Sequence, residues 1–451
     1  MKRPTIARVV ALEVLRAVFE DAKFADRSFR AAASREELTG RERAQAQRLA
    51  YGAVQRRGTS DYLIAELAER PVGELDSSLV AVLRLGLYEL LFMDAVPDHA
   101  AVDQAVELAR EQGGGAGTGL VNAVLRRASR ERSRLLAGLS DVTRERAAVK
   151  HSHPTWLARM WWTQLGPDAA RRMMAAGNEP PETAMRANPL RAEPEATLSA
   201  LRSAGIDASR PEAPPPLALP EAIVIQGAMG DATLEGIQAG RLTPQSRASM
   251  AVVEVLDPRP GERVLDLCAA PGGKASQIAA RMGNEGEVVA VELDSERAAE
   301  LRDFLARMDA RNVRVVEADA AMADLGEGYD RVLVDPPCSD LGTLAARPDA
   351  RWRKSPQLIE RLATLQQRML VNAAGALRPG GTLVYSTCTI SRRENEALVA
   401  GLADSGKLGL GVDRLGEEYP DVVSAVDPRF LQTRPDRDGT DGFFLARLRK
   451  A

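Results

Sequence analysis

The sequence predicts three successive parts: an all-α N-terminal region, a small mixed α/β module, and a C-terminal α/β domain with a doubly wound, Rossmann-like sheet. Three observations support this prediction. Apolar residues recur at helical spacing in residues 1–135, short strands interrupted by prolines occur in residues 150–245, and strands alternate with helices in residues 246–451. At 451 residues the chain also exceeds the roughly 250–300 residues at which a single core stops growing.

The composition is that of a globular protein, with 45% hydrophobic and 27% charged residues. The apolar run near the N-terminus stops at Glu13 and then continues at helical spacing, which disfavours a signal peptide. No stretch approaches the roughly twenty apolar residues of a membrane span. We therefore expect a cytoplasmic protein without membrane contact, whose cysteines are reduced thiols.

The N-terminal region is predicted to be helical throughout. An amphipathic helix begins near Ile6, and residues 79–91 are apolar nearly all round, as expected of a central buried helix. Residues 120–125 belong to a final helix, and the glycines at 113–115 break the chain before it. These patterns predict a helical domain over residues 1–135.

Two groups of basic residues stand out against a net charge of only −3. The first group contains Arg126, Arg127, Arg130, Arg132 and Arg134, and the second contains Arg347, Arg351, Arg353 and Lys354. The first is either a solvated helix face or a nucleic-acid contact. The second directly follows a cysteine-containing loop, so we expect it to contact the substrate.

The middle module, residues 150–245, combines short helices with strands near residues 185–190 and 223–225. Residues 214–216 are three consecutive prolines, which predict an exposed and stiff connection. No chemical motif is apparent in this module, so we interpret it as a linker or an accessory RNA-binding element.

The C-terminal domain is predicted to contain a mostly parallel sheet. Strands are expected in residues 263–267, 287–292, 313–317, 331–334 and 382–385, with a late strand near 442–448. Helices fit between them in residues 275–281, 295–308 and 356–377. In such a sheet the carboxyl ends of the strands share one edge, where ligands bind.

A glycine-rich turn follows the first of these strands. Its residues are Cys268, Ala269, Ala270, Pro271, Gly272, Gly273 and Lys274. The turn leads into an apolar helix and so places backbone N–H groups at a helix N-terminus. Glu292 ends the next strand, where a ribose-binding acid is expected, and Asp319 and Asp335 close two further strands. Three acids on successive strands favour a bound cofactor over unrelated loop carboxylates, although the glycines alone also allow a nicotinamide-binding fold.

Cys338 and Cys388 each follow a predicted strand at once. Both are flanked by Pro, Ser or Thr rather than by apolar residues, so we interpret them as reactive thiols rather than as core residues. Cys268 lies in the glycine-rich turn, where a small residue also packs well against a sheet. The positions of the first two predict thiolate chemistry beside the cofactor.

Several of these segments resemble the motifs of a known family. Residues 266–274, 335–339 and 386–389 resemble those of S-adenosylmethionine-dependent RNA cytosine-5 methyltransferases. The N-terminal region resembles NusB-like RNA-binding domains through residues 84–90, 96–97, 105–109 and 120–126. The fusion of both resembles the Sun/Fmu-type 16S ribosomal RNA methyltransferases of bacteria, and the resemblance covers essentially the whole chain.

The resemblance implies methyl transfer from S-adenosylmethionine to C5 of a cytidine in RNA, expected to be 16S ribosomal RNA, through a covalent adduct at C6. It assigns the attack on C6 to Cys388 and assistance in product release to Cys338. It places Asp335 at the cytosine edge, bordering the cofactor, and Lys274 near the reacting base. The cofactor would be held by residues 268–274, by Glu292 at the ribose hydroxyls and by Asp319 at the adenine.

Three departures from the family pattern and two alternative functions accompany this expectation. Glu292 stands where many relatives have Asp, residues 242–246 lack the acid that often follows Gln245, and Asp340 stands where a small residue is usual. The alternatives are a transfer RNA cytosine-5 methyltransferase and a NusB-like RNA-binding regulator with an inert C-terminal domain. The presence of Lys274, both loop cysteines and Asp335 argues against the regulator. We expect no metal and a monomer, and the sequence leaves the target nucleotide and the oligomeric state open.

Overall fold

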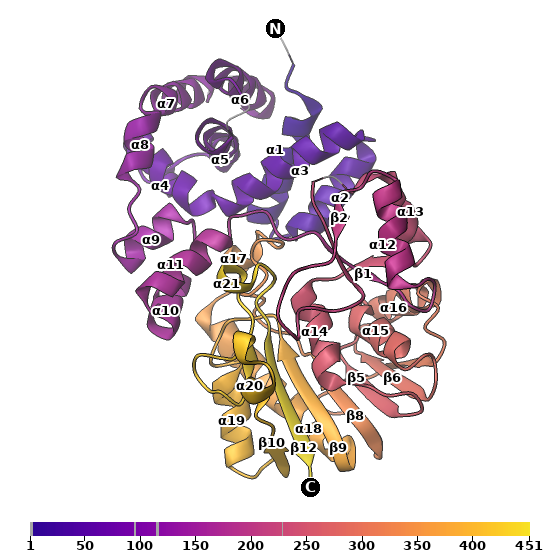
Figure 1. The fold of residues 1–451 in the computed structure, drawn as a ribbon. Coiled ribbons are helices and arrows are strands. Elements are labelled where there is room, and N and C mark those ends of the chain that lie inside the picture. The colour runs from indigo at the N-terminus through magenta and orange to yellow at the C-terminus, as the bar shows by residue number, and fades with distance from the viewer. Residues whose placement is uncertain (1–2, 94–95, 114–116, 228) are drawn as a thin grey trace. The chain divides into compact units, whose positions relative to one another are not determined.

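The computed structural model describes residues 3–93, 96–113, 117–227 and 229–451. The chain divides into two compact units (Figure 1), an N-terminal unit of Met1–Pro180 with Leu344–Lys354 and a C-terminal unit of Pro181–Thr343 with Ser355–Ala451. The interruption between two helices that the sequence predicts at Gly114 and Gly115 lies outside the described residues. Among those described, no helix is both long and apolar enough to cross a membrane.

The N-terminal unit is helical, as predicted. Its helices are α1 (Ile6–Phe19), α2 (Ala25–Arg35), α3 (Gly40–Gln55), α4 (Arg57–Ala68), α5 (Ser77–Phe92), α6 (Asp98–Gly113), α7 (Thr118–Arg130), α8 (Arg132–Gly138), α9 (Arg144–Lys150), α10 (Thr155–Leu165), α11 (Pro167–Ala176) and α17 (Ala350–Arg353). Helix α5 is buried along its length and packs against α1, α3, α4, α6 and α7. It is therefore the central helix that its apolar sequence predicts.

The charged residues of α5 are paired inside this bundle. Arg8 donates two hydrogen bonds to the buried Glu89 at 2.6 and 3.0 Å, and Arg84 contacts Asp61 at 2.7 and 2.9 Å. Burial raises the pKa of Glu89, although Arg8 opposes that shift. A buried charge without a partner is strongly destabilising, so both pairs hold the helices in place.

A small antiparallel sheet opens the C-terminal unit. Its strands lie in the order β2-β3-β1-β4, with β1 (Ala184–Ala187), β2 (Ala208–Ser209), β3 (Ala222–Ile225) and β4 (Leu242–Pro244). Helices α12 (Pro194–Ser203) and α13 (Gly230–Gln238) complete this module. Pro214 and Pro215 are exposed as predicted, whereas Pro216 is buried.

The larger sheet of the C-terminal unit has its main strands in the order β10-β12-β9-β8-β5-β6-β7 (Figure 1). The strands are β5 (Arg263–Leu267), β6 (Glu287–Glu292), β7 (Val313–Glu317), β8 (Tyr329–Val334), β9 (Leu377–Thr387), β10 (Leu410–Val412), β11 (Leu431–Gln432) and β12 (Phe444–Lys450). Strands β5 to β9 are parallel, and β12 adds an antiparallel edge next to β9, with β10 and β11 paired to it. The chain runs outward from β5 through β6 to β7 and then returns to place β8 and β9 on the other side of β5. This strand order confirms the predicted doubly wound fold.

Helices cover both faces of the larger sheet. They are α14 (Arg247–Leu256), α15 (Gly273–Arg281), α16 (Ser295–Arg307), α18 (Pro356–Ala376) and α19 (Glu396–Asp404), with short helices α20 (Leu415–Glu418) and α21 (Pro435–Asp438) near the edge. Helices α18 and α19 pack on the face that carries Leu265 and Val332, and α14 and α15 pack on the face that carries Val264 and Leu333. The central parallel strands β5, β6 and β8 are largely buried, so their ends are the parts available for chemistry.

Candidate active site

The thiols of Cys338 and Cys388 lie side by side at the carboxyl edge of the larger sheet. Strands β8 and β9 are parallel neighbours in which Val334 pairs with Tyr385, so the loops that follow them start at the same edge. The two Sγ atoms are 3.3 Å apart. Cys338 is buried and Cys388 is partly exposed, and both are free thiols.

Lys274 and Asp335 form an ion pair at the same edge. Lys274 is on the first turn of α15, and its Nζ lies 2.7 Å from Asp335 Oδ2. Ser386, near the end of β9, donates a hydrogen bond to Asp335 Oδ1 at 2.9 Å. Burial lowers the pKa of Lys274, but the Asp335 carboxylate raises it more, so the pKa is above its usual value. A charged ammonium thus fixes the carboxylate from one side and a hydroxyl from the other.

Asp340 faces both thiols. Its Oδ1 lies 3.2 Å from Cys388 Sγ and 3.9 Å from Cys338 Sγ. The backbone of Asp340 has a φ of 56°, in the left-handed region that Asp tolerates better than most residues. In the sequence Asp340 stands out only as a departure from the family pattern, whereas in the structure it is a neighbour of both sulfur atoms.

Glu394 links the two cysteine loops, and the sequence analysis missed it. Its carboxylate accepts hydrogen bonds from the Ser339 N–H at 2.9 Å, from the Ser339 hydroxyl and from Gln366 at 3.1 Å. The Ser339 hydroxyl also contacts the Thr389 hydroxyl at 2.7 Å. Because Ser339 and Thr389 each follow a cysteine in the chain, this buried carboxylate sets the relation of the two loops. The position of Glu394, six residues after Cys388, is the only feature of the sequence that points to this role.

The glycine-rich turn approaches α16 closely at Gly272. This residue has a φ of 111°, and a Cβ added to it would lie 2.7 Å from Phe304 and 2.8 Å from Leu301. Glycine is therefore required both by the conformation and by the space. The turn ends at Gly273, where α15 begins, so that backbone N–H groups of the helix start face the edge of the sheet.

Glu292 lies at the end of β6, next to the turn. Its Oε1 accepts hydrogen bonds from the backbone N–H groups of Leu293 at 3.0 Å and Asp294 at 3.2 Å, and it contacts Arg297 at 3.3 Å. Its Oε2 is buried and has no hydrogen-bond partner among the residues that the structure describes. A buried acceptor without a donor is costly, so this oxygen suits a ligand hydroxyl.

Two further acids, Asp319 and Asp266, lie on either side of β6 in the larger sheet. Asp319 follows β7, and its Oδ1 accepts the Ala321 N–H at 2.9 Å. Asp266 is inside β5, where burial and, to a lesser extent, the Asp335 charge raise its pKa to about 8. Burial, followed by Asp335, also raises the pKa of Cys268 to about 12, so this thiol is protonated at neutral pH. Cys268 therefore lacks the thiolate character of a nucleophile.

Arg351 of the second basic group does not behave as predicted. Arg351 is fully buried in the N-terminal unit, where its guanidinium donates to the Gly177, Ser152 and Leu344 carbonyls and to the Asn178 side chain. Nearby, the Trp352 indole N–H donates to the Val54 carbonyl at 2.8 Å. The prediction that Arg351 contacts substrate is wrong, because its donors are used to satisfy buried carbonyl groups.

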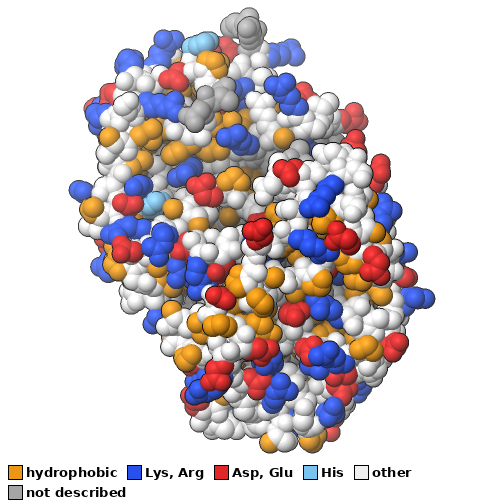
Figure 2. All heavy atoms as spheres, in the orientation of Figure 1, with side chains coloured by type: hydrophobic (Ala, Val, Ile, Leu, Met, Phe, Trp, Pro, Cys, Tyr) orange, Lys and Arg blue, Asp and Glu red, His pale blue; other side chains and the backbone are white. Residues whose placement is uncertain are grey.

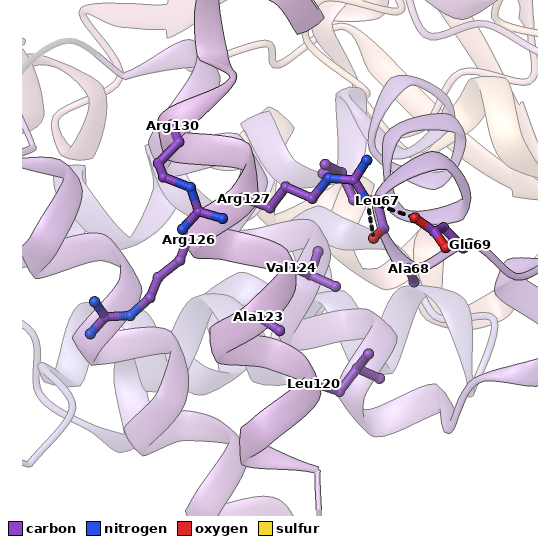
Figure 3. A pocket seen from close by; sticks show the side chains of 9 residues that line it. All are labelled: Leu67, Ala68, Glu69, Leu120, Ala123, Val124, Arg126, Arg127 and Arg130. Carbon is purple, nitrogen blue, oxygen red and sulfur yellow. Dashed lines mark hydrogen bonds and ion pairs between the residues drawn. The ribbon is translucent and has the colours of Figure 1, made fainter.

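The first basic group borders a shallow pocket between α4 and α7 (Figure 3). Arg127 points to the end of α4, where it contacts Glu69 at 3.1 Å and the Leu67 carbonyl at 3.2 Å, and it also pairs with Glu131. Arg126 and Arg130 are exposed. Elsewhere on the surface shown in Figure 2, basic and acidic side chains are interspersed. The pocket therefore combines exposed cations with the apolar side chains of Leu120 and Val124.

Three family models match the chain. A model for 16S rRNA methyltransferase RsmB/F matches residues 253–449, and a model for the NusB family matches residues 5–130. A third, for the ferredoxin-like domain of RsmF/B-like methyltransferases, matches residues 153–230. These matches identify the helical bundle as a NusB domain, the middle module as ferredoxin-like and the larger sheet as a methyltransferase domain.

Similar proteins from other organisms match this chain over almost its full length. The chain is 31% identical to a probable ribosomal RNA small subunit methyltransferase B of Bacillus subtilis and 32% identical to one of Synechocystis, with 99% of each chain covered in both cases. The solved structure of a methyltransferase homolog protein from Pyrococcus horikoshii matches with a TM-score of 0.59 and 27% identity, over 68% of this chain and 98% of that one.

Proposed function

The chain belongs to the 16S rRNA methyltransferase RsmB/F family, and from this premise we propose that it methylates C5 of a cytidine in small-subunit ribosomal RNA. The proposed methyl donor is S-adenosylmethionine. The observation that carries the proposal is the pair of sulfur atoms 3.3 Å apart beside the Lys274–Asp335 ion pair.

Two thiols suit this reaction because C5 of cytosine is a poor nucleophile. Addition of a thiolate at C6 forms an S–C6 bond and moves the electron pair of the C5–C6 double bond onto C5, which then takes the methyl group. The methylated C5 still carries its proton. That proton must leave so that the double bond re-forms, the S–C6 bond breaks and the thiolate is released.

We assign these steps to residues of the cluster. Cys388 attacks C6, and Cys338 assists the loss of the C5 proton and hence product release. Asp335 hydrogen-bonds the polar edge of the cytosine, with its orientation fixed by Lys274 and Ser386. Lys274 lies beside the base and balances the negative charge that gathers there.

The residues further along the sheet edge fit S-adenosylmethionine. The buried Oε2 of Glu292 has no hydrogen-bond donor among the described residues, and the ribose hydroxyls would provide one. Asp319 follows the neighbouring strand β7 and would contact the adenine. The turn at residues 268–274 holds the methionine end, because the backbone N–H groups at the start of α15 face the edge of the sheet. When bound, the cofactor supplies the electrophilic methyl group of its sulfonium.

We propose a different role for each of the three predicted regions. Residues 1–135 bind RNA, residues 150–245 form an accessory module, and residues 246–451 carry out catalysis. A target base within a helix would have to be flipped out of the stack or be unpaired already. Small-subunit RNA is favoured over transfer RNA because the similar proteins are named for the small subunit.

Bisulfite sequencing of RNA tests this proposal. A strain that lacks the protein is compared with strains that express the wild type or Cys388→Ala. We expect one protected cytidine in small-subunit RNA with the wild type and none in the other two strains. A change confined to transfer RNA would support the transfer RNA alternative, and no change in either RNA would support the RNA-binding regulator.

A further inference from the structure

Cys338, Asp340 and Cys388 bring three potential metal-ligand atoms together. The two Sγ atoms and one Asp340 carboxylate oxygen all lie within 4.8 Å of one another. The individual separations are 3.3 Å between the sulfurs and 3.2 and 3.9 Å from the sulfurs to Asp340 Oδ1. Two sulfurs and one carboxylate oxygen are a donor set typical of zinc and related soft divalent cations.

The loop that carries Asp340 is held in place by its own hydrogen bonds. The Gly342 N–H donates to the Cys388 carbonyl at 3.0 Å, and the Thr343 N–H donates to the Asp340 carbonyl at 3.1 Å. Gly342 also accepts the Gly442 N–H at 2.9 Å, and a Cβ on Gly342 would lie 1.9 Å from the Gly442 carbonyl oxygen. The three donor atoms are therefore arranged by the backbone before any ligand arrives, which reduces the cost of binding.

The spacing of the donor atoms matches one face of a tetrahedral site. With Zn–S bonds of about 2.3 Å and Zn–O bonds of about 2.1 Å, tetrahedral geometry separates two sulfurs by about 3.8 Å and a sulfur from an oxygen by about 3.6 Å. The observed separations differ from these values by a few tenths of an ångström. The fourth position would remain open, as at sites where zinc keeps an exchangeable ligand.

We propose that Cys338, Asp340 and Cys388 form a binding site for a thiophilic divalent cation such as Zn²⁺. On binding, each thiol loses its proton to solvent, and two S–metal bonds and one O–metal bond form without any change in oxidation state. Both sulfurs are then occupied, so the bound cation blocks adduct formation and protects the thiols from oxidation. The consequence for activity rests on the proposed function, whereas the binding itself does not.

Cadmium titration of the full-length, reduced protein tests the site directly, with Cd²⁺ as the probe. Cadmium bound to thiolates gives a sulfur-to-metal charge-transfer band in the ultraviolet, which is independent of methyl transfer. We expect the band to saturate at one equivalent and to diminish when excess Zn²⁺ competes for the site, while Mg²⁺, a hard cation, has no effect. No band at one equivalent would overturn the proposal.

Three variants identify the ligands. Cys388→Ser should abolish the saturable band, and Asp340→Asn should weaken Cd²⁺ binding by more than the roughly 10–100-fold typical of outer-shell changes, because it removes a charged ligand. Cys268→Ser is the matched control, and its band should equal that of the wild type because Cys268 lies outside the cluster. Unchanged affinity in Asp340→Asn, or loss of the band in Cys268→Ser, would show that this site is not the one that binds the cation.

Discussion

The sulfur atoms of Cys338 and Cys388 lie 3.3 Å apart although fifty residues separate the two cysteines in the chain. Their proximity arises from the parallel pairing of β8 with β9, which brings the two following loops to one edge. Asp340 and the Lys274–Asp335 pair surround them. A single cytosine could therefore meet both thiols, and the two are expected to act at different steps.

The first prediction separates the roles of the two thiols. Cys388→Ala should abolish methylation, because no bond to C6 can form. Cys338→Ala should still permit attack and methyl transfer, but elimination should be slow, so the protein remains bonded to its RNA. A denaturing gel after incubation with RNA and S-adenosylmethionine should show a shifted band for Cys338→Ala and none for Cys388→Ala.

Two other gel patterns would contradict these assignments. A shifted band in Cys388→Ala alone would make Cys338 the nucleophile, as in DNA cytosine methyltransferases. Intact methylation in both variants, with no adduct in either, would make both cysteines packing residues. Cys268→Ala should give no trapped adduct, because its raised pKa keeps this thiol protonated.

The second prediction concerns Glu394 as a positioning residue. Glu394→Gln replaces one carboxylate oxygen by an NH2 group, which donates and cannot accept, so one of the two hydrogen bonds from Ser339 is lost at a cost of about 1–3 kcal/mol. We expect kcat to fall about tenfold or more while the Kd for S-adenosylmethionine stays unchanged. Stopped-flow methyl transfer and calorimetry measure the two quantities.

Glu396→Gln is the matched control for this prediction. Glu396 is also buried and accepts a hydrogen bond from Ser424 at 2.7 Å, away from the cysteine loops. It should lose some stability but keep its rate of methyl transfer. Equal rate losses in both variants would mean that Glu394 acts only through general stability.

Much of the larger sheet could be predicted from the sequence. The strands at 263–267, 287–292 and 313–317 agree with β5, β6 and β7 at both ends, because each is a short run rich in Val or Leu that is bounded by turn residues. The antiparallel edge formed by β10 and β11 was not predicted. These two strands are three and two residues long and depend on pairing with β12, which is a tertiary contact without a local signal.

The basic side chains show where residue type alone misleads. Arg351 and Arg126 both lie within two residues of another arginine in the sequence, yet the first is fully buried and the second is exposed. Arg351 is used to satisfy carbonyl groups that the fold buries, a requirement that arises only once the chain is folded. Glu394 could not be predicted for the same reason, because its hydrogen-bond partners are Ser339 in a distant loop and Gln366 in helix α18.

The third prediction concerns the cofactor. Glu292→Ala and Asp319→Ala should each weaken S-adenosylmethionine binding, with a loss of about 1–3 kcal/mol for removal of a hydrogen-bond partner of the cofactor. Glu287→Ala is the control, since Glu287 begins the same strand, at the opposite end, and pairs with Arg263 at 2.9 Å and Arg314 at 3.1 Å. Calorimetry that gives undiminished affinity in both test variants would exclude this edge as the cofactor site.

The fourth prediction concerns pH and stability. Burial raises the pKa of Asp266 to about 8, whereas in the unfolded chain the pKa is about 3.9. Between these values the folded protein holds a proton that the unfolded chain has lost, so stability falls as pH rises through this window, by at most about 1.4 kcal/mol per pH unit. Asp266→Asn should remove this dependence.

Hydrogen exchange of the amides in β5 and β6 measures this effect locally, after correction for the intrinsic effect of pH. Tryptophan fluorescence would miss it, because Trp156, Trp161, Trp162 and Trp352 all belong to the N-terminal unit. From pH 5 to pH 8, protection in the wild type should decline relative to Asp266→Asn. Parallel profiles for the two proteins would mean that Asp266 is ionised in the folded state.

The last prediction concerns RNA binding by the NusB domain. Arg126 and Arg130 are exposed beside the pocket between α4 and α7, whereas Arg127 is held by Glu69 and Glu131 (Figure 3). Phosphate contacts release counterions, so each one contributes about −0.7 to −0.9 to the slope of log affinity against log salt. Arg126→Ala and Arg130→Ala should each make the slope shallower by nearly one, measured by filter binding of small-subunit RNA to the full chain. Arg127→Ala should leave the slope unchanged, because its charge is already neutralised, and a loss equal to that of Arg126→Ala would show that Arg127 leaves its carboxylates to bind phosphate.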